Sequence, residues 1–441
     1  MLNTIHVGVD DTDSPRGGCT TYVAALLVTE LENLECEFID YPNLIRLNPN
    51  VPWKTRGNGA VSLRFKCPSN RVEEAVQRIL RVVEENSDLG YANTDPAVSI
   101  LVGEVPQEVT SFSFKAIRNV VSVDEALQVA STTGVKTYPL KGRRGIVGSL
   151  AALGEVLKND HTFELIAYRS RQNIGTPRKV DYESVVEMDG KTRPFTYNNY
   201  DPEKRRILIT PHGADPILYG IRGETPQIVL EASRMLAVKE PVERWVIFRT
   251  NHGTDMHYSG LQTVKDLEPH HPVTLEGVVA ETPKTIQGGH VFFTLADETG
   301  TVECAAYEPT GSFKDAVKQL NVGDSVKVYG GVKPPGNKHP LTVNLEKLEV
   351  KKIYSQLLCL NPKCPMCGRR MESAGKGQGY RCKKCKTKQP SKIWEERPRA
   401  LKPGLYIPPP RAQRHLTKPI TRYGLEKNGC SIELTVKWHY P

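Results

Sequence analysis

Three aspartates near the N-terminus have the residue type and spacing to hold a metal ion. Asp10, Asp11 and Asp13 directly follow an apolar run over residues 5–9 that is typical of a buried β-strand. Carboxylate oxygens are the ligands that Mg²⁺ prefers, and α/β folds bind ligands where strands end. The sequence therefore predicts a metal site here. The alternative is that these aspartates serve only turn and capping chemistry.

A glycine turn and a helix start follow the aspartates. Gly17 and Gly18 precede Thr20 and Thr21, which open an apolar, helix-like run to Leu31. Free backbone N–H groups at a helix start bind phosphate, and glycine allows close backbone approach. Both threonines are placed to cap this helix, where a hydroxyl would also face a terminal phosphate. Metal ligands beside a phosphate cradle indicate nucleotide chemistry.

This segment differs from the common nucleotide-binding motifs. It does not match the Walker A pattern, and the chain lacks the protein-kinase motif set. We expect basic side chains to hold the phosphates. They come from an irregular segment rich in Pro, Gly and Asn and from a basic glycine turn: Lys54, Arg56, Lys141, Arg143 and Arg144.

Four cysteines form a second chemical site. They are arranged as two C-x-x-C pairs separated by fourteen residues: Cys364, Cys367, Cys382 and Cys385. Two such pairs supply four thiolates for tetrahedral Zn²⁺ and leave no position open for catalysis, so we predict a structural zinc site. A redox dithiol fits less well, because two matched pairs are present. The other six of the ten cysteines are scattered, as expected for reduced thiols rather than a disulfide framework.

Charge is unevenly distributed along the 441 residues. Residues 361–441 contain 19 Lys and Arg against 5 Glu, a net charge of +14, whereas residues 1–360 carry −5. A basic tail indicates a polyanionic partner; a merely solvated tail is the alternative. The chain has 39% hydrophobic residues, no apolar run near the roughly 20 residues of a membrane span, and no signal-peptide pattern at its start. We therefore expect a cytoplasmic protein without membrane contact.

The elements that must position these residues fall into five regions. Residues 1–158 alternate strand-like and helix-like runs, and residues 159–262 read as a β-α-β unit of ferredoxin-like type. Residues 268–352 alternate apolar and polar positions over five strands with one short helix, which is typical of an OB-fold barrel. Residues 358–395 hold the cysteines. Residues 396–441 are a basic, Pro-rich tail that we expect to run over the surface of other domains.

Within the first two regions the patterns predict individual elements. In the first region we expect strands over 5–9, 60–65 and 98–102 and helices over 20–31, 72–85 and 125–130. In the second region we expect strands over 206–211 and 244–250 around a helix over 225–238.

Other candidate residues have an equally simple structural explanation. Aromatic residues of the barrel could stack on bases but could as well be core: Phe292, Phe293, Tyr307, Phe313 and Tyr329. Loops 211–224 and 250–257 mix glycine with charged residues and could bind a small polar ligand or only form turns. His212, His252 and His257 do not have the spacing of a metal chelate.

Several segments together carry a resemblance to a known family. They run in order from the start to near residue 390: GVDDTDSPRGGCTTY, LIRLNPNVPWKTRGNGAVS, ELIAYR, PILYGIRGE, TNHGTDMH, GGHVFF, CAAYEPT and CPMCGRRMESAGKGQGYRCKKCKTK. On these motifs the chain resembles the archaeal tRNA(Ile) agmatidine synthetases, also called 2-agmatinylcytidine synthetases.

The resemblance implies a fold, an activity and site residues. These enzymes use ATP to attach agmatine to C2 of cytidine 34 in the CAU anticodon of a tRNA(Ile), which then reads AUA codons. Their domains are a kinase-like α/β catalytic domain, a ferredoxin-like domain, an OB-fold and a zinc ribbon. The match makes Asp10, Asp11 and Asp13 the metal and catalytic positions, and Thr20 the threonine that the enzyme phosphorylates on itself.

The chemistry of the residues agrees with this implied activity. The C2 oxygen of cytidine is a poor leaving group until a phosphoryl group from ATP activates it, and Mg²⁺ on the aspartates would offset the charge of that transfer. The target base must leave its stack. Agmatine is a dication, so its pocket needs carboxylates or carbonyls. Our candidates lie in the second region: Asp215, Tyr219, Gly220, Arg222 and Glu224.

Two other functions stay open at this level. The chain could be an ATP-dependent ligase for another RNA and another amine. It could also be a non-catalytic nucleic-acid-binding protein of OB-fold and zinc-ribbon type, which would leave the aspartate and glycine segment unused. The sequence decides neither the oligomeric state nor which carboxylate binds metal and which acts as base.

Overall fold

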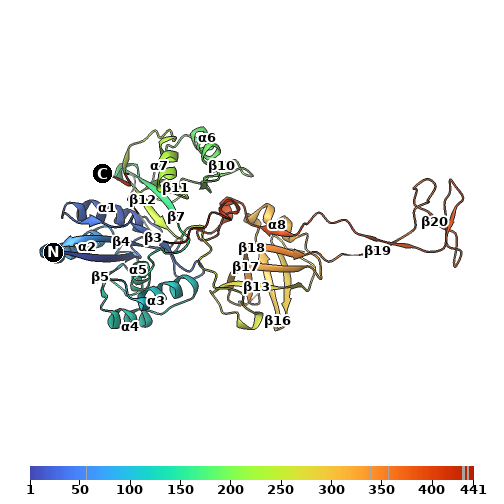
Figure 1. Ribbon diagram of the computed structural model, residues 1–441, viewed down its shortest axis with the longest axis horizontal. Coiled ribbons are helices and arrows are strands. Elements are labelled where there is room, and N and C mark those ends of the chain that lie inside the picture. The colour runs from blue at the N-terminus through green and yellow to red at the C-terminus, as the bar shows by residue number, and fades with distance from the viewer. Residues whose placement is uncertain (56, 338, 356, 430–432, 435–436) are drawn as a thin grey trace.

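The structure is a computed structural model that describes the whole chain except residues 56, 338, 356, 430–432 and 435–436. It consists of a large α/β body, a β-barrel beside it, and a small cysteine-bearing module at the end of an extended arm (Figure 1). The start and the end of the chain both lie on the α/β body.

One sheet runs through the α/β body. Its main strand order is β6-β5-β1-β4-β3-β12-β7-β11-β8, with β2 paired to β4 and β25 paired to β12. The first region supplies β1 (Leu2–Asp10), β2 (Glu37–Phe38), β3 (Asn43–Arg46), β4 (Gly59–Pro68), β5 (Ala97–Val102) and β6 (Lys136–Pro139). Its helices are α1 (Thr20–Glu32), α2 (Val72–Glu85), α3 (Gln107–Arg118), α4 (Val123–Thr133) and α5 (Gly145–Gly154).

The second region continues the same sheet. It contributes β7 (Thr162–Arg169), β8 (Thr196–Tyr197), β11 (Ile217–Gly223) and β12 (Val242–Thr250), with α6 (Tyr182–Thr192) and α7 (Pro226–Arg234). A separate short hairpin pairs β9 (Tyr200–Asp201) with β10 (Arg206–Ile207). The two regions meet where β3 and β12 pair in parallel, so they form one continuous sheet.

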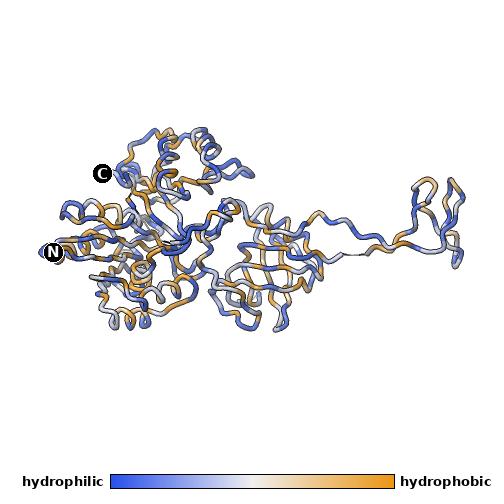
Figure 2. The backbone as a smooth tube through the Cα atoms, viewed as in Figure 1, coloured by the Kyte–Doolittle hydropathy of each residue, from blue (hydrophilic) through white to orange (hydrophobic). Residues whose placement is uncertain are grey.

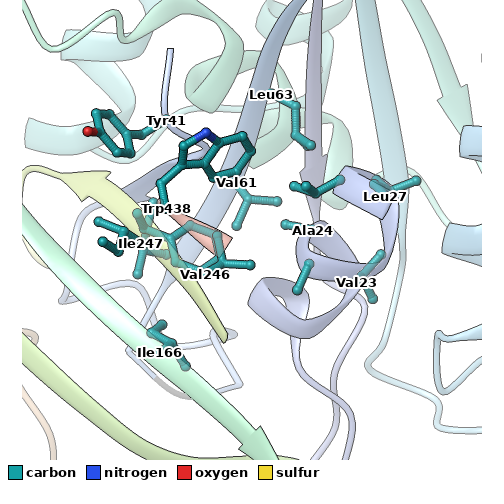
Figure 3. Packing of buried hydrophobic residues seen from close by; sticks show 14 of the residues in the cluster. Val23, Ala24, Leu27, Tyr41, Val61, Leu63, Ile166, Val246, Ile247 and Trp438 are labelled. Carbon is teal, nitrogen blue, oxygen red and sulfur yellow. The ribbon is translucent and has the colours of Figure 1, made fainter. Parts of the chain in front are cut away.

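Helices cover both faces of this sheet. On one face α1 and α2 pack on β1 and β4, and on the other face α3, α4 and α5 form a second core with Ala97 and Leu101 of β5. Helix α1 is apolar over most of its surface and has eight buried residues, as expected for a core helix. Figure 3 shows Val23, Ala24 and Leu27 of α1 facing this core. Hydrophobic positions recur along the strands of the sheet and of the barrel (Figure 2).

Most of the predicted elements form with small differences in their bounds. Helix α2 spans the predicted residues 72–85. The predicted strand over 206–211 is wrong beyond its start, because β10 ends at Ile207. The predicted helix over 225–238 ends at Arg234.

Sequence reasoning missed several further elements, among them β3, β7, β11, α3 and α6, and residues 217–223 of the predicted loop 211–224 are strand β11. Strand β7 is buried along its whole length, so it shows no polar alternation that would mark a strand. Helix α3 contains Thr, Ser and Phe, which are modest helix formers, and it is held by burial of Val109, Phe112 and Ile117. Tertiary packing therefore decides these elements.

The barrel has the five strands and the short helix predicted for an OB-fold. The strands are β13 (Pro272–Val279), β15 (Val291–Asp297), β16 (Gly300–Ala306), β17 (Ser325–Lys333) and β18 (Thr342–Lys352). They follow the order β13-β17-β18-β16-β15, and pairing of β13 with β15 closes the barrel. A two-strand pairing adds β14 (Lys284–Thr285), and α8 (Ser312–Val317) packs on the core.

The barrel aromatics divide between core and surface. Phe293 and Phe313 are buried in the barrel core, so the structural explanation is correct for them. Phe292, Tyr307 and Tyr329 are only half-buried.

An arm carries the cysteine module away from the barrel. The arm pairs β19 (Leu357–Leu360) with β23 (Ile393–Glu396). At its end β20 (Glu372–Ser373), β21 (Tyr380–Arg381) and β22 (Lys388–Gln389) form a three-stranded sheet. Figure 1 shows this module far from the α/β body.

The C-terminal tail corrects our expectation of a surface segment. Strand β24 (Gly404–Tyr406) adds to β18 of the barrel, and β25 (His439–Tyr440) adds to β12 of the large sheet. Trp438 is 8% exposed and its ring centroid lies 5.3 Å from that of Phe38 in the core. The tail is therefore an integral part of both bodies.

A buried ion cluster fastens the tail to the second half of the sheet. The fully buried guanidinium of Arg422 pairs with Glu224 and, at 2.9 Å, with Asp160. Lys427 also bonds Glu224, at 2.7 Å.

Among the helices of the described residues, none is long and apolar enough to cross a lipid bilayer.

We expect Arg422→Ala to destabilise the α/β body strongly. It leaves the buried Glu224 and the half-buried Asp160 without their main partner, and breaking a buried ion pair costs roughly 3–5 kcal/mol. Urea unfolding followed by circular dichroism measures the change. The matched control is Arg397→Ala at an exposed arm position, where we expect a change within about 0.5 kcal/mol. Equal effects of the two variants would contradict the role assigned to Arg422.

Candidate active site

A cavity of about 900 Å³ lies where the two halves of the large sheet meet. The end of β1, the start of α1, loop residues 51, 53–55 and 57–58, and the start of α5 line it from the first half. Strands β7 and β11 and residues 208–212 line it from the second half, and His415 lines it from the C-terminal tail. One cavity thus collects side chains from segments that are far apart in the chain.

The predicted aspartates form an acidic end of this cavity. Asp10, Asp11 and Asp13 all line it. Asp11 accepts hydrogen bonds from the Asp95 backbone N–H at 3.2 Å and from Arg144 at 3.0 Å. Burial and the nearby charge of Asp11 raise the pKa of Asp10 well above its ordinary value. A cation bound here would relieve this crowding of carboxylates.

Helix α5 approaches the acidic end closely enough to shape it. A Cβ atom on Gly148 would lie 1.8 Å from Oδ2 of Asp10, and a Cβ atom on Gly8 would lie 1.9 Å from the Ser149 carbonyl oxygen. Ser99 and Ser149 share a hydrogen bond of 2.7 Å between β5 and α5. The absence of side chains at these glycines therefore determines where Asp10 can lie.

The two threonines lie in the cavity but do not cap α1 as expected. The N-cap residue is Cys19, which makes no side-chain capping bond. Thr20 and Thr12 are buried and their hydroxyl oxygens are 3.0 Å apart. The Thr21 hydroxyl lies 3.0 Å from the Cys19 sulfur. Thr20 therefore lines the cavity without a capping role.

The glycine turn and the basic residues are only partly at the cavity. Gly17 and Gly18 do not line the cavity: Ser14 and Gly17 form a bridge, and Gly18 has φ of +79°, a conformation that favours glycine. Arg144 and Lys54 line the cavity. Lys141 and Arg143 do not line it, and the Lys141 ammonium group donates to the Tyr91 carbonyl at 2.6 Å. Arg56 lies outside the described residues.

The agmatine candidates of the second half are also divided. Asp215, Gly220 and Arg222 line the cavity. Tyr219 points to the other side of β11, where its hydroxyl bonds Ser233 at 3.0 Å, and Glu224 is occupied by Arg422. Successive strand residues face opposite sides, so the predicted run of neighbours cannot all reach one pocket.

A polar cluster in the cavity wall was missed by sequence reasoning. It consists of Arg46 at the end of β3, Glu164 on β7, His252 after β12, Arg222 on β11 and His415 of the tail. The sequence analysis singled out only His252 and Arg222 as candidates, because Arg46, Glu164 and His415 belong to no local chemical motif. Their meeting depends on strand order.

The four cysteines converge as a metal site should. Their ligand atoms all lie within 4.8 Å of one another, which fits tetrahedral Zn²⁺. Within the part of the chain that the structure describes, this is the one group of potential ligands gathered so closely. The aspartates of the cavity fit Mg²⁺ in a different manner, because Mg²⁺ is usually held by one or two carboxylates together with substrate phosphates.

Family models match nearly the whole chain. Residues 6–142 match the TiaS TCKD domain and residues 143–257 match the TiaS FLD domain. Residues 273–351 match an OB-fold nucleic acid binding domain, and residues 361–401 match the TiaS C-terminal zinc ribbon domain.

Relatives are similar along their full lengths. A protein of Archaeoglobus fulgidus, named as the 2-agmatinylcytidine synthetase TiaS of an isoleucine tRNA, is 44% identical over 96% of this chain and 98% of its own. A protein of the same name from Methanosarcina mazei is 42% identical over 94% of this chain and 97% of its own.

Solved structures have the same fold. Apo TiaS, an agmatidine synthetase of isoleucine tRNA, superimposes with a TM-score of 0.87 at 42% identity, over 95% of this chain and 97% of that one. A complex of TiaS with its isoleucine tRNA and ATP superimposes with a TM-score of 0.83 at 42% identity and the same coverage. A cavity with an acidic end, a closed barrel, a four-cysteine module and this similarity along the chain agree, and the chain belongs to the TiaS family, the 2-agmatinylcytidine synthetases of isoleucine tRNA.

Proposed function

We propose that this protein attaches agmatine to C2 of cytidine 34 in the CAU anticodon of tRNA(Ile) and uses ATP to do so. The observation that carries the proposal is the single cavity that unites the acidic end of β1, the start of α1 and the polar wall of the second half. Support also comes from a related structure with 38% identity, a complex of TiaS with its isoleucine tRNA, AMPCPP and agmatine, which has a TM-score of 0.82.

The reaction has two steps in this proposal. The C2 oxygen of the base attacks a phosphoryl group of ATP, which forms an oxygen–phosphorus bond and breaks a phosphoanhydride bond, so that the rest of the ATP molecule leaves. The primary amine of agmatine then attacks C2, and phosphate leaves with the former C2 oxygen. The product is agmatidine. Positioning and charge compensation supply most of the catalysis in phosphoryl transfer.

The aspartates and the first half of the cavity form the ATP end. Bound Mg²⁺ would neutralise charge on the phosphates, and Asp10, Asp11 and Asp13 are its proposed ligands. Arg144 is held beside Asp11 at 3.0 Å, so it can contact a phosphate without leaving its carboxylate partner. Burial and the nearby charge of Arg414 lower the pKa of Lys54, which nevertheless lies at the cavity wall. Gly17, Gly18 and the N–H groups at the start of α1 complete the proposed phosphate cradle.

The opposite wall of the cavity is the proposed binding site for agmatine. Asp215 lines the cavity beside residues 208–212 and also bonds Arg178 at 3.1 Å. Its carboxylate and the nearby backbone carbonyls suit a dication. Gly220 leaves room next to them, since a Cβ there would meet Glu164 at 3.1 Å.

The remaining regions are proposed to bind the tRNA. The half-buried barrel aromatics offer stacking surfaces, and the cysteine module carries eight basic residues that suit phosphate contacts: Arg369, Arg370, Lys376, Arg381, Lys383, Lys384, Lys386 and Lys388. The proposed functional units are 1–158 for catalysis, 159–262 for the second wall, 268–352 and 358–395 for RNA, and 396–441 for fastening them together. We place the reaction in the cytoplasm, where tRNA and ATP are both present.

Incubation with ATP, labelled agmatine and the CAU-anticodon tRNA(Ile) tests the function. We expect label at position 34 with the wild-type protein. We expect a loss of at least about 100-fold with Asp11→Asn, because this variant removes a charge from the proposed metal site and the partner of Arg144. Nucleoside analysis by mass spectrometry measures the product. Absence of label at position 34, or label on another RNA only, would exclude this substrate pair; unchanged ATP consumption in Asp11→Asn would exclude this ATP site.

Gly148→Ala tests the placement of Asp10. The new methyl group would collide with the Asp10 carboxylate, and a displacement of about 1 Å at a reacting centre can cost about 100-fold in rate. The matched control is Gly190→Ala in α6, where a Cβ atom meets nothing within 4 Å. We expect agmatine incorporation to fall only in the first variant. Equal activity of both variants, with equal thermal midpoints, would show that the position of Asp10 is not critical.

Thr20 is the proposed site of self-phosphorylation. After incubation with ATP we expect phosphate on residue 20 in the wild-type protein and in Thr20→Ser, and none in Thr20→Ala, because only the first two carry a hydroxyl beside Thr12. Peptide mass spectrometry locates the phosphate. Its presence on Thr21 instead, or its persistence on this peptide in Thr20→Ala, would contradict the assignment.

A further inference from the structure

The polar cluster in the second wall is built around one buried carboxylate. Glu164 is 3% exposed, and its Oε1 accepts a hydrogen bond of 3.0 Å from Nε of Arg222 on the neighbouring strand. Its Oε2 lies 3.5 Å from Nδ1 of His252 and 3.9 Å from Nη2 of Arg46. Both distances are longer than a normal hydrogen bond.

Three polar atoms of this cluster have no hydrogen-bond partner within the described part of the chain. They are Oε2 of Glu164, Nε of Arg46 and Nδ1 of His252, and all three are buried. Buried polar atoms in native proteins are nearly always paired. Since Glu164 and Arg46 both line the cavity, a bound ligand is the natural source of the missing bonds.

Arg46 is held rigidly for such a contact. The side-chain amide of Asn251 accepts from its backbone N–H at 2.8 Å and donates to its carbonyl oxygen at 2.9 Å. A Cβ atom on Gly57 or Gly59 would lie within 3.1 Å of its Nη1, so two glycines make room for the guanidinium. Arg46 as a fixed hydrogen-bond donor beside Glu164 as a fixed acceptor can recognise the polar edge of a planar ligand.

The charges decide which ligand fits. Glu164 is an anion and Arg46 and Arg222 are cations. Burial and the charge of Arg222 lower the pKa of His252 to about 3, so this ring is neutral. A phosphate would be repelled by Glu164, and a dication such as agmatine would be repelled by the two guanidinium groups. A neutral heterocycle with a donor beside an acceptor satisfies both unpaired groups.

We propose that Glu164 and Arg46 are specificity-determining residues that read the Watson–Crick edge of the target cytosine. Oε2 of Glu164 accepts from the N4 amino group, and the Arg46 guanidinium donates to N3 and O2. This inference rests on the proposed function and names the residues that would select its base. Uracil presents an acceptor at position 4 and a donor at N3, so it meets like groups on both residues.

The placement also suits the chemistry. Arg46 lies close enough to the acidic end for the negative charge of Asp13 to act on it. A base read in this manner directs its O2 edge toward Arg46 and thus toward the side of the cavity where the aspartates lie. Recognition at N4 and activation at O2 would then use opposite ends of the Watson–Crick edge.

The test compares the CAU-anticodon tRNA(Ile) with cytosine and with 2-pyrimidinone at position 34. The second base lacks only the N4 amino group, so it isolates the bond to Glu164. For the wild-type protein we expect kcat/KM to fall about 10- to 100-fold on this change. For Glu164→Gln we expect kcat/KM with cytosine to fall. We expect the ratio of kcat/KM between cytosine and 2-pyrimidinone to drop below about 3. Comparing the base preference of the wild-type protein with that of Glu164→Gln cancels any effect of the amino group on the reactivity of C2, because both proteins use the same two bases.

The matched control is Glu240→Gln. Glu240 is a buried carboxylate paired with Arg169 at 2.7 Å, outside the cavity, and we expect it to keep the wild-type preference. If Glu164→Gln does not fold, the affinity of the agmatine-free wild-type protein for anticodon stem-loops decides, with an expected loss of about 10-fold for 2-pyrimidinone.

The outcomes separate this inference from the proposed function. Absence of agmatine at position 34 with the wild-type protein and cytosine removes the proposed function itself. With that activity present, an intact base preference in Glu164→Gln overturns the inference, and so does a raised KM for agmatine with intact preference. Equal affinity of the wild-type protein for the two stem-loops also overturns it.

Discussion

The parallel pairing of β3 with β12 is the interaction on which the rest of the structure depends. Arg249 pairs with Asn43 and Thr250 with Leu44, which joins two half-sheets into one. The nearby ion pair between Arg249 and Asp40 is buried, with 3.2 Å between their charged atoms. Buried pairs of this kind specify one arrangement, because any other leaves a charge unpaired. The cavity exists only while these two half-sheets are aligned.

The C-terminal tail depends on this same alignment and reinforces it. Arg422 bonds residues of the second half, Asp255 bonds the backbone of Lys418, and His415 lies edge-on to His252 with ring centroids 4.8 Å apart. Burial and the charge of Arg46 hold the pKa of His415 well below its ordinary value, so it adds a neutral ring to the cavity wall. Because the tail also pairs with the barrel through β24, it connects the barrel to the large sheet that holds the cavity.

The parts of the site that were predicted are those with local spacing. The aspartates after β1 and the threonines at the start of α1 are near neighbours in the sequence and line the cavity, although the threonines do not cap α1 as expected. The two cysteine pairs converge in one group. The prediction of the agmatine-binding residues was less accurate, because successive residues of a strand point their side chains to opposite faces of the sheet. Tyr219 and Glu224 were grouped with Asp215 as candidates for agmatine binding, yet strand pleating and the Arg422 cluster place both outside the cavity.

The sequence by itself determined the chemical groups and the type of each region, because turns, helix starts, metal knuckles and strand periodicity depend on contacts between near neighbours. It determined the aspartate end, the zinc ligands, the OB-fold barrel and the basic charge of the tail. Only the tertiary structure decided that Arg46, Glu164, His252 and His415 meet in one polar cluster and that the tail enters the core. These contacts depend on the order of the strands across the β3–β12 junction. No local sequence pattern encodes that order, because the free energy that selects it comes from burying distant residues against one another.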